Sequence, residues 1–194
     1  MTQPTLNDLR KRQIIDAAIT VFGQKGFHQA RMLDISEAAG VSKGTPYRYF
    51  KDKNALITAV ANKVFDQELG ELDMVRHLQG TAVEKLRIMA HFFAAGSEEA
   101  EAYAPLIYEF YAMSVRRADV RQILSEYLHI SIKIVQDILR QGVEQGEFPA
   151  IDVEKTAVTY MALLEGTVAQ ELYNPTVNVS EQLQFGINLL LKGL

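Results

Sequence analysis

The 194-residue sequence contains no cysteine, which excludes disulfide bonds and all chemistry that depends on a thiol. It also contains no apolar run that approaches the length of a membrane span, and no signal-peptide core near its first residues. Alternating strand patterns, internal repeats and low-complexity segments are missing as well. Hydrophobic residues make up 48% of the chain, which is typical of a soluble globular protein. We therefore expect a cytoplasmic protein.

Patterns that would support catalysis or metal binding are missing too. The four histidines share no helical i, i+3 or i, i+4 spacing and have no cysteine near them, so we expect no metal site. The sequence has neither a recognisable nucleophile motif nor a glycine-rich loop that would bind phosphate. We therefore expect a protein that is not an enzyme and that needs no cofactor.

Charge is divided unevenly along the chain. The net charge is −4, but residues 1–60 carry nine Lys and Arg against five Asp and Glu, a balance of +4. The remaining residues carry eleven against nineteen, a balance of −8. Charge does fluctuate along any chain, but a basic segment followed by an acidic one suits a protein that contacts DNA with one end.

The basic segment is centred on residues 31–53, whose pattern predicts two short helices joined by a tight turn. Apolar residues recur at helical spacing in its first half, at Met32, Ile35, Ala38 and Ala39. Gly40 can take the left-handed conformation that ends a helix, and the Ser42 hydroxyl can cap the next one. Two helices joined by a short turn that contains glycine form a helix-turn-helix motif.

Residues 10–56 resemble the DNA-binding domain of the TetR family of transcriptional regulators. The matching residues are Ile14, Ile15, Ala17, Ala18, Phe22, Gly26, Phe27, Asp34, Ile35, Ala39, Gly40, Val41, Ser42, Lys43, Gly44, Tyr47, Tyr49, Phe50, Lys53 and Leu56. The resemblance implies an all-α fold of about nine helices. A three-helix DNA-binding domain over 1–52 would precede a ligand-binding and dimerisation domain over 53–194. It also implies a dimeric regulator, a repressor that a small molecule releases from a pseudo-palindromic DNA operator.

The sequence departs from the family pattern at two places. Ala30 and Arg31 stand where members have small hydroxyl residues, so a hydroxyl cap is missing there. Pro46 replaces a bulky apolar residue in the recognition helix. If Ser42 is the cap, Pro46 is the fourth helical residue and sacrifices one backbone bond. We therefore expect a recognition helix that is short or slightly distorted.

Nine residues are candidates for contact with DNA: Arg31, Ser42, Lys43, Gly44, Thr45, Tyr47, Arg48, Tyr49 and Lys53. Early recognition-helix positions contact bases in helix-turn-helix proteins, and Arg48 is the best candidate for reading a guanine. The family resemblance gives Tyr47 a phosphate contact, whereas Tyr49 is equally suited to the core. We also expect a phosphate contact from Lys53, at the start of the following helix.

The rest of the chain has the pattern of a series of helices. We predict helices over residues 6–25, 53–69, 81–95, 102–117, 120–145, 152–173 and 180–192. Asp52, Asp152 and Ser180 are the expected caps of three of them.

Aromatic residues are frequent in the second half of the chain, where each one alone is most simply interpreted as core. As a group, Phe93, Tyr103, Ile107, Phe110, Tyr111, Tyr127 and Tyr160 resemble the lining of an apolar pocket. The family resemblance favours a cavity for a mostly apolar small molecule. Because Phe110 and Tyr111 fall outside the DNA-binding domain, we expect alanine at either position to leave DNA binding unchanged.

The last two predicted helices each carry apolar residues on more than one face. Such helices are either fully buried or pack partly against a second chain, and the family resemblance favours a homodimer. The predicted interface residues are Met161, Gly166, Leu183, Ile187 and Leu190. Two other functions stay open: an architectural DNA-binding protein of this fold without a small-molecule effector, and a small all-α enzyme or carrier.

Overall fold

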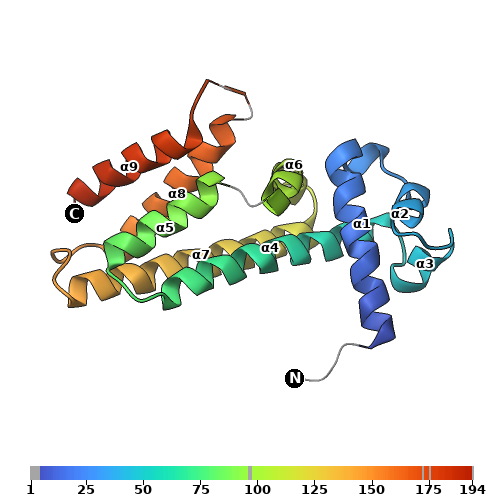
Figure 1. Ribbon diagram of the computed structural model, residues 1–194, viewed down its shortest axis with the longest axis horizontal. Coiled ribbons are helices and arrows are strands. Elements are labelled where there is room, and N and C mark those ends of the chain that lie inside the picture. Colours follow the sequence, from blue (N-terminus) through green and yellow to red (C-terminus); the bar gives the residue numbers. More distant parts are fainter. Residues whose placement is uncertain (1–4, 96–97, 172, 175, 194) are drawn as a thin grey trace. The chain divides into compact units, whose positions relative to one another are not determined.

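The computed structural model describes residues 5–95, 98–171, 173, 174 and 176–193, and the side chains of all these except 95, 98–105 and 171. Every regular element in this part of the chain is an α-helix (Figure 1). The nine helices are α1 (Leu6–Gln29), α2 (Met32–Ala38), α3 (Thr45–Tyr49), α4 (Lys53–His77), α5 (Ala82–Ala95), α6 (Glu98–Ser114), α7 (Ala118–Glu144), α8 (Val153–Glu171) and α9 (Val179–Gly193). The all-α prediction is confirmed. No helix among the described residues is both long and apolar enough to cross a membrane.

The chain forms two compact units that do not follow sequence order. Unit 1 comprises Met1–Asp66 and Glu98–Ser125, and unit 2 comprises Gln67–Ser97 and Glu126–Leu194. The helix-turn-helix therefore shares its unit with α6, which lies far from it in the sequence. The long helices α4 and α7 each contribute to both units. The division into domains at residue 52 stays a prediction, because it concerns which segments function separately.

Unit 1 is built around α1. Thr5 caps this helix: its hydroxyl accepts a hydrogen bond from the Asp8 amide at 3.2 Å, and the Asp8 carboxylate accepts one from the Thr5 amide at 3.0 Å. The buried side of α1, which includes Ile14, Ala18 and Phe22, packs against α2 and α6. Gly26, with φ of 69°, breaks α1 before its last turn, and the ring of Phe27 folds back onto Phe22 at 5.0 Å between centroids.

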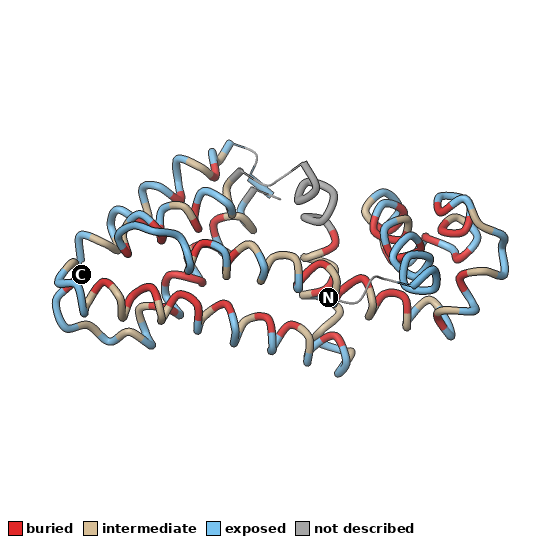
Figure 2. The backbone as a smooth tube through the Cα atoms, turned by 60° about the horizontal axis from the view of Figure 1, so that its bottom comes forward, coloured by how far each residue is buried: buried red, intermediate tan, exposed pale blue. Residues whose placement is uncertain are grey.

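Unit 2 combines α5, α8 and α9 with parts of α4 and α7. In Figure 1, α5 and α9 lie side by side, and α8 also packs against both of them. Tyr160 lies in the core, where its hydroxyl donates to the Leu86 carbonyl. Burial raises the pKa of this phenol. Buried residues recur at helical spacing along α4, at Leu56, Val60, Val64, Leu72 and Val75. Figure 2 shows the same alternation of buried and exposed residues along the helices of the chain.

Two details of the helices differ from the sequence prediction. Helix α4 continues past Gly70 to His77, because a glycine inside a helix costs only about 1 kcal/mol and the next turns bury Leu72 and Val75. The cap of α9 is Asn178 rather than Ser180, since the Asn178 side chain accepts from the Glu181 amide at 3.1 Å. The caps predicted at Asp52 and Asp152 are confirmed by bonds from the amides of Ala55 and Lys155.

Candidate nucleic-acid interface

The first helix of the motif, α2, is fixed at both ends by hydrogen bonds. Arg31 precedes it without a side-chain cap, but the Asp34 carboxylate accepts from the Arg31 amide at 2.8 Å. This bond lowers the pKa of Asp34, and an ion pair with Lys25 lowers it further. At the other end Gly40 has φ of 61°, and the amides of Gly40 and Val41 donate to the carbonyls of Glu37 and Ser36. The predicted glycine end of α2 is confirmed.

The recognition helix α3 begins later than predicted. Ser42 does not cap it: the Ser42 carbonyl accepts from the Thr45 amide at 2.8 Å, which makes residues 42–45 a turn, and the two hydroxyls bond each other at 2.7 Å. The helix starts at Thr45, so Pro46 is its second residue. Amides in a first turn have no partner inside the helix, and Pro46 therefore costs little there. Pro46 is buried, in the place of the bulky apolar residue of the family pattern.

Most of the predicted DNA contacts lie in α3 and in the turn before it, residues 42–49. Ser42, Lys43, Gly44 and Arg48 are exposed, and Tyr47 has 53% of its surface accessible. Thr45 and Tyr49 are half-buried. No carboxylate occurs between Glu37 and Asp52, so the cations of this segment are not neutralised by neighbours in sequence. Hydroxyl and cationic donors on one open face suit the phosphates and base edges of a major groove.

Arg31 and Lys53, the remaining candidates, have different surroundings. Arg31 is exposed beside α2. Lys53 is turned inward: its ammonium donates to the carbonyls of Phe27 at 2.8 Å, His28 at 3.2 Å and Ala30 at 3.0 Å. An ammonium has three donors, and these bonds use all of them. Lys53 thus holds the segment that leads into α2, and this arrangement leaves no donor for a phosphate.

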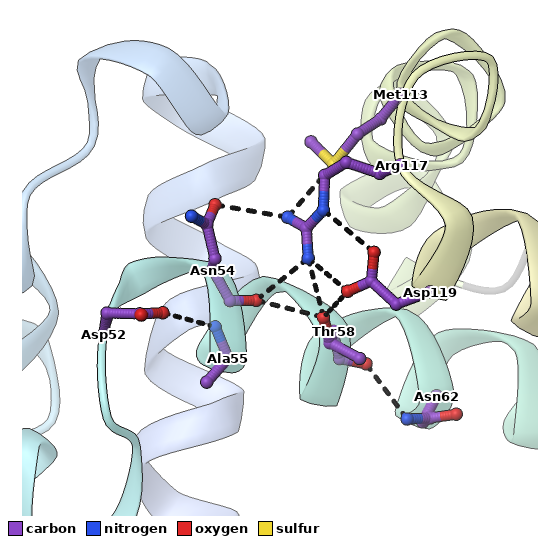
Figure 3. Close-up of polar contacts among 8 residues, drawn as sticks. All are labelled: Asp52, Asn54, Ala55, Thr58, Asn62, Met113, Arg117 and Asp119. Atoms are coloured by element: carbon purple, nitrogen blue, oxygen red, sulfur yellow. Dashed lines mark hydrogen bonds and ion pairs between the residues drawn. The ribbon is translucent and has the colours of Figure 1, made fainter.

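The first turns of α4 are held by the corner between α6 and α7 (Figure 3). The Arg117 guanidinium donates to the Asn54 amide oxygen at 3.2 Å and to the Thr58 hydroxyl at 2.9 Å, and it also pairs with Asp119. Thr58 in turn donates to Asp119 at 2.8 Å. The Arg117 bonds hold the pKa of Asp119 well below its usual range. No local sequence pattern signals this network, because its bonds from Arg117 and Asp119 to α4 span 59 to 63 residues.

The predicted ligand residues are divided between the two units. Ile107, Phe110 and Tyr111 belong to unit 1, whereas Phe93, Tyr127 and Tyr160 belong to unit 2. The side chain of Tyr103 lies outside the described part of the chain. Phe110 is fully buried, with its ring centroid 4.9 Å from that of Phe27 and 5.8 Å from that of Phe65. It is thus part of the core of unit 1, to which the helix-turn-helix also belongs. The effect of its replacement on DNA binding stays a prediction.

The predicted dimer residues differ in how accessible they are. Met161, Leu183 and Ile187 are buried in the core of unit 2, and Leu190 is half-buried. Gly166 is exposed, and a Cβ added to it would meet no atom within 4 Å. The apolar side chains that do face solvent on α8 and α9 are Val158, Phe185 and Leu189, which are 51–60% accessible. Each of these helices has two apolar faces, so the sequence pattern does not indicate which face is buried in the core and which is exposed.

Two family models match most of the chain. Residues 14–60 match the model of bacterial regulatory proteins of the tetR family, and residues 82–186 match the C-terminal domain of BetI-type transcriptional repressors. The chain belongs to the TetR family. It is a DNA-binding transcriptional regulator with a helix-turn-helix domain, and its relatives are regulators rather than enzymes.

Similar proteins and structures extend over nearly the whole chain. The fatty acid metabolism regulator protein of Bacillus subtilis is 27% identical over 165 residues, which is 84% of this chain and 83% of that protein. The crystal structure of FadR from B. subtilis in complex with stearoyl-CoA has a TM-score of 0.72 at 25% identity and covers 94% of this chain and 98% of that one. A TetR-family regulator from Cytophaga hutchinsonii has a TM-score of 0.87 at 21% identity, with coverage of 100% and 98%.

Proposed function

We propose that this TetR-family regulator is a homodimeric repressor that a mostly apolar small molecule releases from a pseudo-palindromic operator. The observation that carries the proposal is the open surface formed by α3 and the turn before it, where Lys43, Tyr47 and Arg48 are exposed in a segment without carboxylates. A dimer would place two such faces about 34–36 Å apart, on successive turns of the major groove.

Within this proposal the DNA contacts have separate roles. Arg48 reads a base edge, together with Thr45 at the start of α3 and with Lys43 and Gly44 in the turn before it. Other contacts go to phosphates and fix the register on the duplex without reading sequence. Ser42, Tyr47, Tyr49 and Arg31 belong to this group. Lys53 contributes differently, because its ammonium bonds three carbonyls of the protein itself.

The proposed dimer contact is the exposed apolar face of α8 and α9. Phe185 and Leu189 lie four residues apart on α9, and Val158 and Gly166 lie two turns apart on α8. The small residues Ala162 and Gly166 let a second backbone approach closely. The side chains of Met161, Leu183 and Ile187 would then support this face from inside the protomer rather than touch the partner.

The proposed effector is mostly apolar. The BetI-type model covers residues 82–186, where most of the aromatic residues lie, and FadR of B. subtilis was crystallised with an acyl-CoA. Candidate contacts are Phe93, Tyr103, Ile107, Tyr111, Tyr127 and Tyr160, and we set Phe110 apart because it belongs to the core of unit 1. An effector can release DNA only if it binds the two arrangements of the dimer unequally.

Fluorescence polarisation on a duplex selected by the protein from a randomised library tests this function. Stearoyl-CoA is the first effector to try, with coenzyme A and stearate as partial ligands. Release should appear as an operator affinity lowered by roughly 5- to 150-fold, and operator should weaken ligand binding by the same factor. Failure to select any duplex would contradict DNA regulation itself. Selection of a duplex whose affinity no apolar ligand changes would favour the architectural alternative.

A further inference from the structure

The segment between the break in α1 and the start of α2 connects the scaffold of unit 1 to the helix-turn-helix. It runs from Gly26, whose φ of 69° interrupts α1, to Arg31, which precedes α2. The Ala30 amide donates to the Gly26 carbonyl at 3.2 Å. Four other backbone groups of the segment bond to residues outside it: the amide of Phe27 and the carbonyls of Phe27, His28 and Ala30. We call residues 26–30 the entry turn.

Helix α6 supplies the partner for the amide. The Glu109 carboxylate accepts from the Phe27 amide at 3.0 Å, across 82 residues of sequence. The approach is close: a Cβ built on Gly26 would lie 3.0 Å from Glu109 Oε1. The next residue of α6, Phe110, packs its ring on that of Phe27. Two successive residues of α6, Glu109 and Phe110, thus both contact Phe27 in the entry turn.

Helix α4 supplies the partners for the carbonyls. The Lys53 ammonium bonds all three of them, from the first residue of α4. The entry turn is therefore held by a carboxylate from one helix and an ammonium from another. Lys53 stands next to the recognition segment in sequence, whereas Glu109 belongs to a helix that carries none of the predicted DNA contacts.

We propose that Glu109 is a positioning residue for DNA binding, which sets the orientation of the helix-turn-helix by holding the entry turn. The proposal rests on the DNA-binding function described above. When Glu109 is engaged, α2 and α3 leave the scaffold in one direction, which pre-organises the recognition face. Without this bond the turn samples several directions, and only a fraction of molecules is competent to bind. The apparent affinity for DNA then equals the affinity of the competent molecules multiplied by their fraction.

Helix α6 is then a control point for DNA affinity. A shift of α6 that separates Glu109 from the Phe27 amide would let the orientation of α2 and α3 vary, although α6 does not contact DNA in this proposal. Ile107 and Tyr111, two of the proposed ligand contacts, lie on the same helix. A ligand that displaces α6 would therefore reach the DNA-binding surface through Glu109.

Two conservative variants distinguish the effect of the length of the Glu109 side chain from the effect of its charge. Glu109→Gln removes the charge but keeps an oxygen at the same distance along the side chain, so the amide bond survives. Glu109→Asp keeps the charge but shortens the side chain by one methylene, so the bond is lost. Asp16→Asn is the matched control, because Asp16 pairs with Lys63 on the surface and does not touch the entry turn.

The measurement is polarisation of the selected duplex, together with hydrogen exchange of the Phe27 amide and thermal melting to verify that every variant is folded. We expect Glu109→Asp to lower affinity about 5- to 150-fold and to speed exchange at Phe27, while Glu109→Gln and Asp16→Asn bind like the wild type. Equal affinity of folded Glu109→Asp and wild type would overturn the proposal. A loss of affinity in Glu109→Gln with none in Glu109→Asp would overturn it too, because the side chain would then act through its charge and not through the bond to the Phe27 amide. Failure of the wild type to select any duplex would contradict DNA binding instead.

Discussion

Two helices of this protein, α3 and α9, present exposed faces of opposite chemistry. The face of α3 carries hydroxyl, phenol and cationic groups, and its one buried residue is Pro46. The face of α9 carries Phe185 and Leu189, which are 60% and 57% accessible. Water solvates the first face well and the second poorly, so the second gains most from a partner that covers it.

Exposure therefore has a different meaning in each unit. On α3 the donors are accessible because a polar ligand, the DNA backbone, must reach them. On α9 the apolar residues are accessible because another copy of the chain is expected to bury them. A dimeric DNA-binding protein needs both faces, since one half-site alone gives little affinity. Substitutions can remove either face while the other stays intact.

The largest effect is expected from Gly166→Trp. Gly166 is exposed, and a Cβ added there would meet no atom within 4 Å, so we expect the indole to extend into solvent in the monomer and to block the proposed partner. Loss of the dimer should lower operator affinity roughly 10²- to 10⁴-fold, because the second half-site no longer binds intramolecularly. Sedimentation velocity and polarisation measure the two consequences. Gly70→Trp is the control, at a glycine that is equally open on α4.

The next effect concerns the recognition face. Arg48→Ala should cost about 1–3 kcal/mol on the selected operator and relax the preference at one base pair. A systematic set of single base-pair substitutions in the duplex measures both. Lys51→Ala, also exposed but outside α3, serves as control and should leave the sequence preference intact. An Arg48→Ala variant that discriminates as well as the wild type at every position would remove the base-reading role.

Lys53 and Lys43 should differ, although both belong to the predicted DNA contacts. Lys53→Ala removes three bonds to backbone carbonyls, and we expect it to lower the free energy of unfolding by about 1.5–3 kcal/mol. Lys43→Ala should leave stability unchanged and reduce the slope of log affinity against log salt by about 1. Urea denaturation and salt titrations separate the two. If Lys53→Ala instead reduces the salt slope by the same amount and leaves stability unchanged, Lys53 contacts a phosphate.

The smallest effect should come from Glu68, a half-buried carboxyl on α4 that belongs to neither face. Burial, opposed by a hydrogen bond from Tyr127, raises the pKa of Glu68 to about 7. The folded protein then binds more protons than the unfolded chain between pH 4.5 and 7, so stability falls as pH rises through this window. Glu68→Gln should flatten this dependence by on the order of 1 kcal/mol, as judged from urea midpoints at about pH 5 and pH 8. An unchanged slope in the variant would remove Glu68 as its source.

The sequence predicted the helix-turn-helix well because its signals are local. Gly40 and Asp52 act on neighbours within a few residues, and the structure has the expected conformation at Gly40 and the expected bond at Asp52. The start of α3 was misplaced because Ser42 is equally suited to a turn and to a cap. Only the backbone bond from Thr45 decides between them.

The remaining features depend on contacts between distant segments. Lys53 lies 23–26 residues from the carbonyls that it bonds, and Glu109 lies 82 residues from the amide whose hydrogen bond it accepts. Nothing in the periodicity of α6 indicates that Phe110 faces Phe27 and Phe65 rather than a ligand. On α8 and α9 both stripes are apolar, and burial alone separates Met161 and Leu183 from Val158 and Phe185.

The most direct test of the central claim, that the two faces act together, is the stoichiometry on DNA. Mass photometry of the wild type on the selected duplex should show two chains per duplex, with half-sites about one helical turn apart. Gly166→Trp should show one chain or none at the same concentration, while Gly70→Trp matches the wild type. A single wild-type chain bound at full affinity, or a Gly166→Trp dimer that binds the operator unchanged, would contradict the account.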